Sequence, residues 1–268
     1  MPRTGMGQAQ HARQQPDAAG ALMRRALMAL LALPLLLAAV PAHAADGALA
    51  GKVIVLDPGH QLGNSNPKFR KQIAQTRFNG SIVKNCNTTG TATNAGLPEA
   101  TFTWKVANRL KPILEAQGAT VLMTRTSNSR NAYGPCVWDR AGFANQHKAD
   151  AMIAIHADGA PANAHGFFAI APTRIKGWTT DTYKVDRRLS KAMLAGMTAA
   201  GGNPANYIAN QLQIRGDQST INFSKVPTTI IEVGNMRNAS DARRMSSAAG
   251  QQQYAQWLAA GVERYFAR

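Results

Sequence analysis

Short apolar runs alternate with amphipathic blocks from residue 52 to the C-terminus, and this alternation constrains the fold more than any other feature. The apolar runs, each expected to form a strand, occupy residues 52–57, 119–124, 151–155, 166–171 and 228–233. Apolar runs without polar alternation are typical of strands buried on both faces. Strands that alternate with helices favour parallel pairing under helical layers. The sequence therefore predicts a single-domain α/β fold, a largely parallel twisted sheet with helices on both faces.

The amphipathic blocks predict helices that begin near Pro98 and that span residues 138–147, 180–200 and 251–266. In the first of these, apolar residues recur at helical spacing and would face the core: Phe102, Val106, Leu110 and Ile113. Pro98 suits the first helical position. Pro112 lies inside the pattern, so we expect a kink or an early end there.

The first 44 residues have the pattern of a secretory signal peptide. Arg24 and Arg25 precede an apolar run at 26–40, and Ala42-His43-Ala44 fits a small-x-small cleavage site. A membrane anchor is the alternative, but 15 apolar residues are fewer than the roughly 20 that span a bilayer. We predict export to the periplasm, the extracellular space or the cell wall. Residues 45–268 would be the mature domain, without a stable membrane anchor.

The mature domain would be strongly basic. The chain has 268 residues, 30 Lys+Arg and 14 Asp+Glu, a formal net charge of +16. Residues 1–44 hold four arginines and one aspartate, so the remaining 224 residues carry about +13. Such a protein is attracted to anionic cell-envelope polymers, lipid headgroups or nucleic acid. Aromatic residues are 6% of the chain and do not interleave with basic ones, which disfavours nucleic acid. We expect an envelope partner and a monomeric protein.

Cys86 and Cys136 are the two cysteines of the chain. So few cysteines exclude a disulfide-dense mini-scaffold, and the lack of a cysteine cluster excludes a zinc-finger module. In an oxidising compartment each is the partner available to the other for a disulfide. Two free buried thiols are the alternative.

Polar residues stand at or near the ends of three expected strands. His60 follows the first strand after two turn residues, His156 directly follows the third, and Glu232 lies near the end of the last. Ligand sites in such sheets form beyond the carboxyl ends of the strands. Glu99 opens a helix after the long segment 61–97, which lacks periodicity and by its length suggests a functional loop. These four residues could converge on one edge of the sheet.

Each of the four residues also has a structural interpretation. The histidines could be hydrogen-bonded turn residues, and Glu99 could be a first-turn glutamate favoured by the helix dipole. Glu232 is harder to explain in this way, because a carboxylate in an apolar strand must be paired, metal-bound or catalytic. An ion pair with Arg125 or Arg140 would satisfy it equally well.

Two histidines and a glutamate are also the ligand set of a catalytic zinc, whose fourth position is open to water. Zinc lowers the pKa of that water towards about 7 and polarises a carbonyl. A second carboxylate that is not a ligand is then needed to transfer the proton. The four residues meet this need, although their spacing alone does not decide between a zinc site and structural roles.

Six motifs occur in the order and relative placement of one known family. They are VIVLDPGH (53–60), LPE (97–99), LMTR (122–125), RAGFAN (140–145), AIHAD (154–158) and VPTTIIEVGNMRN (226–238). On these motifs the chain resembles the zinc-dependent N-acetylmuramoyl-L-alanine amidases of the amidase-3 type, from about residue 52 to the C-terminus. The segments NCNTTG (85–90) and GPC (134–136) resemble the compact mycobacterial-type members with one disulfide.

The resemblance implies that His60, Glu99 and His156 bind one Zn²⁺ and that Glu232 is the general base and acid. The substrate would be peptidoglycan, hydrolysed at the amide that joins the lactyl group of N-acetylmuramic acid to L-alanine of the stem peptide. A zinc peptidase that cuts within the stem peptide is the nearest alternative, because its metal chemistry is the same. A catalytically inactive, basic cell-wall-binding protein is another.

The chain departs from the family pattern at two places. Gln61 and Leu62 stand where Gly-Gly usually follows the first histidine, and residues 126–128 lack the acidic residue that commonly follows LTR. Both departures concern local loop geometry rather than the metal ligands. No extra block stands between His156 and Glu232, so we expect no inserted helix that plugs the site.

Three further residues are candidates for supporting roles. Asp57 could orient His60 from behind the metal ligands, or it could form the turn that closes the strand. Asn222 and Arg215 are expected to contact the substrate, and solvated loop positions are the alternative for both.

Overall fold

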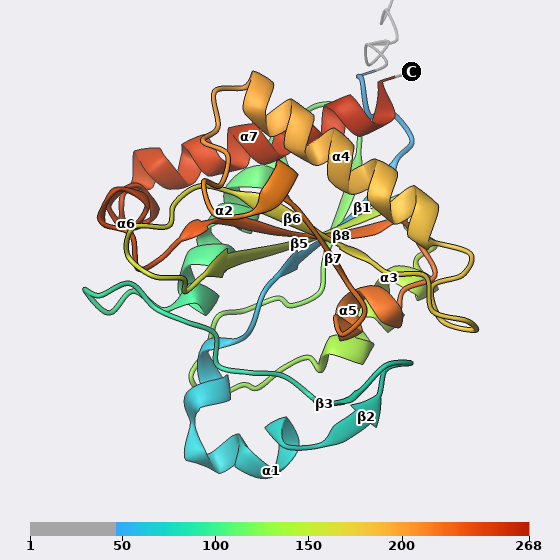
Figure 1. Ribbon diagram of the computed structural model, residues 1–268, viewed down its shortest axis with the longest axis vertical. Coiled ribbons are helices and arrows are strands. Elements are labelled where there is room, and N and C mark those ends of the chain that lie inside the picture. Colours follow the sequence, from blue (N-terminus) through green and yellow to red (C-terminus); the bar gives the residue numbers. More distant parts are fainter. Residues whose placement is uncertain (1–46, 268) are drawn as a thin grey trace, which may run out of the picture. The chain divides into compact units, whose positions relative to one another are not determined.

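A six-stranded sheet in the order β4-β1-β5-β8-β6-β7 organises residues 47–267, the part of the chain that the computed structural model describes (Figure 1). Its strands are β1 (Val53–Pro58), β4 (Thr120–Met123), β5 (Ala151–Asp158), β6 (Phe168–Pro172), β7 (Leu212–Arg215) and β8 (Thr228–Asn235). Strand β6 runs antiparallel to β8, and the other neighbouring pairs are parallel. The predicted α/β fold is confirmed. The predicted signal peptide, 1–44, lies outside the described residues.

Helices cover both faces of the sheet, as predicted (Figure 1). One face packs against α2 (Glu99–Glu115), α4 (Tyr183–Ala199) and α7 (Ala248–Phe266). The other face packs against α3 (Val137–Gln146) and α5 (Ser219–Asn222). Helix α6 (Ala239–Ser246) connects β8 to α7. Successive residues of a strand point to opposite faces, so Ile153 packs in the first layer and Met152 in the second.

The two ends of α2 differ from the sequence prediction. Pro98 is the residue before α2, with extended backbone angles (φ −69°, ψ 143°), rather than its first helical residue. Of the kink or early end expected at Pro112, the early end does not occur, because α2 continues to Glu115. Proline removes only one backbone donor, and near a helix end few hydrogen bonds depend on it.

The segment 61–97, expected to be a loop, contains short elements. These are η1 (Leu62–Ser65), η2 (Pro67–Phe69), α1 (Arg70–Ile73) and an antiparallel hairpin of β2 (Thr76–Phe78) and β3 (Val83–Asn85). A further 3-10 turn, η3 (Ala209–Gln211), precedes β7. The Cys86–Cys136 disulfide is confirmed, and it ties the end of the hairpin to the residue before α3. Among the described residues, no helix has the length and apolar character needed to cross a membrane.

Asp186 on α4 is a buried carboxylate in the helix–sheet interface. Its Oδ1 accepts a hydrogen bond from the Thr228 backbone N–H at 2.9 Å, whereas its Oδ2 has no partner among the described residues. Only 1% of the residue is exposed. Burial raises the pKa of Asp186 to about 7, because desolvation disfavours the charged form.

Asp186 is expected to make stability depend on pH. A carboxyl whose pKa is higher in the folded state than in the unfolded state stabilises the fold fully below the unfolded pKa. This contribution is lost as the pH rises through about 7. Asp186→Asn should therefore flatten the slope of unfolding free energy against pH, by up to about 1.4 kcal/mol per pH unit between roughly pH 5 and 7. Urea unfolding at several pH values measures this slope, and an unchanged slope would contradict the assignment.

Candidate active site

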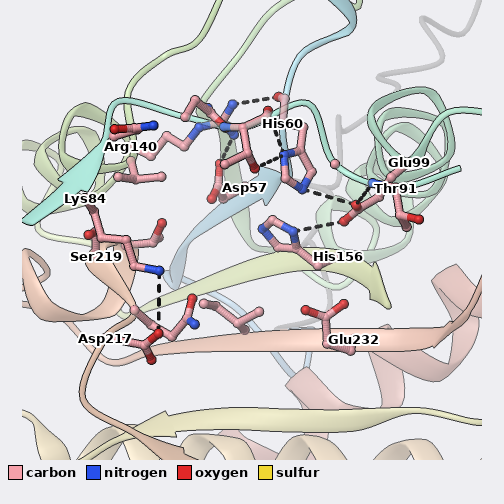
Figure 2. A pocket seen from close by; sticks show the side chains of 18 of the residues that line it. Asp57, His60, Lys84, Thr91, Glu99, Arg140, His156, Asp217, Ser219 and Glu232 are labelled. Carbon is pink, nitrogen blue, oxygen red and sulfur yellow. Dashed lines mark hydrogen bonds and ion pairs between the residues drawn. The ribbon is translucent and has the colours of Figure 1, made fainter. Parts of the chain in front are cut away.

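The structure brings His60, Glu99 and His156 together at the carboxyl edge of the sheet (Figure 2). His60 follows β1, Glu99 is the first residue of α2, and His156 lies in β5. One possible ligand atom from each residue lies within 4.8 Å of the other two. Strand β5 continues two residues past His156 because it stays paired with β8 as far as Asp158.

The Glu99 carboxylate contacts both histidines of this cluster. Its Oε2 lies 3.2 Å from His60 Nε2, and its Oε1 lies 3.0 Å from His156 Nδ1. The backbone N–H groups of Thr91 and Ala157 donate to the same two oxygens, at 3.0 and 3.1 Å. Burial opposes the charge, but His60 and the other donors hold the pKa of Glu99 below its ordinary value. The carboxylate therefore stays ionised.

His60 is positioned through its backbone. Its φ of 59° is in the left-handed region, which is strained for a residue other than glycine. Buried Arg140 stabilises this turn, since its Nη2 donates to the His60 carbonyl at 2.6 Å and its Nη1 to the Pro58 carbonyl at 2.9 Å. His60 Nδ1 lies 3.0 Å from the Thr88 carbonyl, a contact that would orient the ring with Nε2 towards Glu99.

Asp57 supports His60 in a different way from the one expected. The Asp57 carboxylate is 1% exposed and accepts hydrogen bonds from Arg140 and Thr124, and none from the His60 ring. Burial opposes its charge, but the Arg140 guanidinium holds the pKa of Asp57 below its ordinary value. Asp57 thus acts on His60 through Arg140.

Glu232 lies opposite His156 in the pairing of β5 with β8 (Figure 2). Its Oε2 is buried and has no hydrogen-bond partner among the described residues. Burial raises the pKa of Glu232 well above its ordinary value, and the Glu99 and Asp158 carboxylates raise it further. A buried polar atom without a partner is costly, and the Oε2 of Glu232 lies in a residue that lines the cavity.

The structure does not show the ion pair with Arg125 or Arg140 that was the structural alternative for Glu232. Arg125 donates to the carbonyls of Pro58 and Ala100, at 3.0 and 2.7 Å. Arg140 is paired with Asp57. Neither arginine forms an ion pair with Glu232.

A cavity of about 530 Å³ contains all four residues. His60, Glu99 and His156 lie together, and Glu232 faces them from β8 (Figure 2). The hairpin supplies another part of the lining at residues 83–85, and the segment 217–220 before and within α5 supplies a further part. Helix α4, which stands between His156 and Glu232 in the sequence, packs on the opposite face of the sheet.

The two residues expected to contact the substrate differ in their surroundings. Asn222 is fully buried, and its Nδ2 donates to the carbonyls of Asn79 and Gly216 at 2.9 and 2.7 Å. It is not among the residues that line the cavity, and its side chain holds two loops together; a contact of Asn222 with substrate stays a prediction. Arg215 pairs with Asp217, whose side chain lines the cavity, and its contact with substrate stays a prediction.

Sequence reasoning missed Asp158 as a residue of the site. It lines the cavity two residues after His156 on the same strand. The Tyr207 hydroxyl donates to its Oδ2 at 2.8 Å. The sequence contained evidence for placing Asp158 in the site. Residues i and i+2 of a strand share a face, and Asp158 follows His156 by two residues at the end of the AIHAD motif.

The donor set fits a divalent metal such as zinc. Two imidazoles and one carboxylate are typical of catalytic zinc sites, and the close approach of these groups would be stabilised by a shared cation. A partnerless carboxylate in the same cavity is the group that such a site uses for proton transfer. The fold and the site together define a hydrolase-type cavity in which His60, Glu99 and His156 could hold a metal ion.

Comparison with known proteins identifies the family. The family Amidase_3, N-acetylmuramoyl-L-alanine amidase, matches residues 54–264, and the chain belongs to it. An N-acetylmuramoyl-L-alanine amidase of Mycobacterium tuberculosis is 36% identical over 231 residues, which are 84% of this chain and 91% of the relative. These findings confirm the family and the amidase function that the motifs predicted, and they favour it over the two alternatives.

Solved structures agree with this assignment. Crystal structures of the N-acetylmuramyl-L-alanine amidase Ami1 from Mycobacterium smegmatis and Mycobacterium abscessus each superpose with a TM-score of 0.73. Their sequences are 33% and 36% identical to this chain. The superposition covers 81% of this chain in both cases, and 98% and 100% of the respective crystal structures.

Arg140 is expected to be essential for stability. Arg140→Met leaves the Asp57 carboxylate buried without its cation, and breaking such a pair costs about 3–5 kcal/mol of unfolding free energy. The double variant Asp57→Asn/Arg140→Met should recover part of this loss, because no buried charge remains. Exposed Arg130→Met is the matched control and should change stability by less than about 0.5 kcal/mol. Urea unfolding measures all three; equal effects of Arg140→Met and Arg130→Met would contradict the assignment.

Proposed function

We propose that the cavity is the active site of an exported, monomeric zinc amidase that acts on peptidoglycan. His60, Glu99 and His156 would hold one zinc ion. The amide between the lactyl group of N-acetylmuramic acid and L-alanine of the stem peptide would be hydrolysed. The partnerless Oε2 of Glu232, in one cavity with the two histidines and Glu99, is the observation that carries this proposal.

The chain's own residues supply the proton transfers. A zinc ion, when bound, supplies Lewis acidity that activates water and polarises the scissile carbonyl. Glu232 accepts a proton from the attacking water at Oε2 and then donates it to the departing alanine nitrogen. The raised pKa of Glu232 makes its carboxylate a stronger proton acceptor, which suits the first of these transfers.

The proposed location follows from charge, the N-terminal pattern and the relatives. Residues 45–268 carry about +13, which would favour retention on anionic envelope polymers. A Staphylococcus aureus relative, 26% identical over 223 residues, is described as a probable cell wall amidase; this chain matches 60% of its length. Residues 1–44 would direct export, and no step of the proposal involves nucleic acid.

Removal of the metal should abolish activity reversibly. Chelator-treated protein should lose amide hydrolysis, and one equivalent of zinc should restore it. His60→Ala should lower zinc affinity by a large factor, since one of three protein ligands is removed. His165→Ala, which alters a histidine outside the cluster, is the matched control. Zinc per chain measured by atomic emission tests both variants, and full zinc content in His60→Ala would contradict the ligand assignment.

The bond that is cut tests the proposed function itself. Mass spectrometry of digested peptidoglycan should show intact stem peptides with a free L-alanine amino terminus. Glu232→Gln should keep zinc but lower kcat by at least about 10²–10⁴-fold, the usual contribution of a general acid–base group. Fragments cleaved inside the stem peptide would indicate the peptidase alternative, and a near-native rate in Glu232→Gln would overturn the role of this residue.

A further inference from the structure

The active-site cavity has a cationic side that amide hydrolysis as described above does not use. Lys84 in β3 and Asp217 in the segment before α5 both line the cavity and lie next to each other on one side of it (Figure 2). Lys84 Nζ lies 3.5 Å from Asp217 Oδ2. Arg215, at the end of β7, contacts Asp217 from the other side.

Asp217 is already satisfied without Lys84. Arg215 donates from Nε and Nη2 to the two carboxylate oxygens at 2.8 and 2.7 Å, a bidentate arrangement that is among the strongest ion pairs. Lys84 stands beyond ordinary hydrogen-bond distance from the same carboxylate. The three side chains together carry one surplus positive charge, and it belongs to Lys84.

The other cation that lines the cavity is not available to a ligand. In the part of the chain that the structure describes, Lys84 and Arg140 are the lysine and arginine residues of the cavity lining. The Arg140 side chain is 2% exposed and is paired with Asp57. The Lys84 side chain is 39% exposed, so it can reach a group inside the cavity.

The chemistry of the substrate determines what such a cation can bind. An N-acetylmuramoyl unit carries hydroxyl and acetamide groups, and its lactyl carboxyl is consumed in the scissile amide. The negative charges near the scissile bond therefore belong to the stem peptide. A cation on one wall of the cavity fits the peptide and not the sugar.

We propose that Lys84 is a specificity-determining residue that binds a free carboxylate of the stem peptide. The peptide then runs from the catalytic residues towards the β2–β3 hairpin and Asp217, and the sugar lies on the side of the cavity away from the hairpin. Partly exposed ion pairs such as Lys84–Asp217 stabilise little, so Lys84 can turn to the substrate at small cost. This inference rests on the proposed function.

The test uses synthetic N-acetylmuramoyl-L-alanyl tripeptides whose carboxylates are blocked one at a time as amides. In the zinc-loaded wild-type protein, blocking the carboxylate that Lys84 binds should lower kcat/KM about tenfold, mainly through KM, as expected for loss of a binding contact. Lys84→Met should cleave the free and blocked substrates equally well, whereas Lys84→Arg should keep most of the discrimination. Exposed Lys105→Met on α2 controls for loss of one positive charge.

The outcomes separate this inference from the proposed function. If wild-type protein releases L-alanine-terminated peptide from every substrate at equal kcat/KM, the role of Lys84 is wrong and the amidase function stands. The role is also wrong if Lys84→Met discriminates as the wild type does. If no substrate yields a peptide with a free L-alanine terminus, the proposed function itself fails.

Discussion

The buried ion pair between Arg140 and Asp57 is the interaction on which the rest of the site depends. Both side chains are at most 2% exposed, and a buried charge without its partner would destabilise the fold strongly. The pairing therefore fixes α3, which carries Arg140, against the end of β1, which carries Asp57. The remaining donors of Arg140 hold the carbonyls of Pro58 and His60. The backbone of His60 is thus held in place by the packing of α3 against the end of β1.

The charges of the cavity are divided between two walls. Glu99, Asp158 and Glu232 form an acidic wall near the carboxyl edge of the sheet, and burial, reinforced by repulsion from Glu99 and Asp158, raises the pKa of Glu232. A divalent cation held by His60, Glu99 and His156 would compensate this wall. Lys84 stands on the opposite wall with surplus positive charge. One wall therefore suits the chemistry at the amide, and the other suits recognition of an anionic peptide.

The parts of this structure that the sequence predicted are those set by local composition. The central strands are uninterrupted apolar runs, so β1, β5 and β8 were placed within two or three residues. Strand β7 was missed because its four residues alternate apolar and polar at a sheet edge. The β2–β3 hairpin was missed because contacts remote in sequence hold it, including the Asn79 side chain on Asp217 and Ser219. The buried position of Asn222 was missed for the same reason, because its side chain donates to the carbonyl of Asn79, which is remote in the sequence. The sequence could identify the four central residues because they stand in recognisable motifs: His60, Glu99, His156 and Glu232. It could not show that Asp57 acts on His60 through Arg140, because these contacts join residues that are far apart in the sequence.

Anomalous diffraction from crystals of the zinc-loaded protein, recorded above and below the zinc absorption edge, tests the central claim most directly. The account predicts one zinc peak per chain, bonded to His60, Glu99 and His156. Glu232 should face the metal from β8 without bonding to it, so that its carboxylate stays free to transfer a proton. A zinc peak elsewhere in the chain, or one with Glu232 among the ligands, would contradict the account.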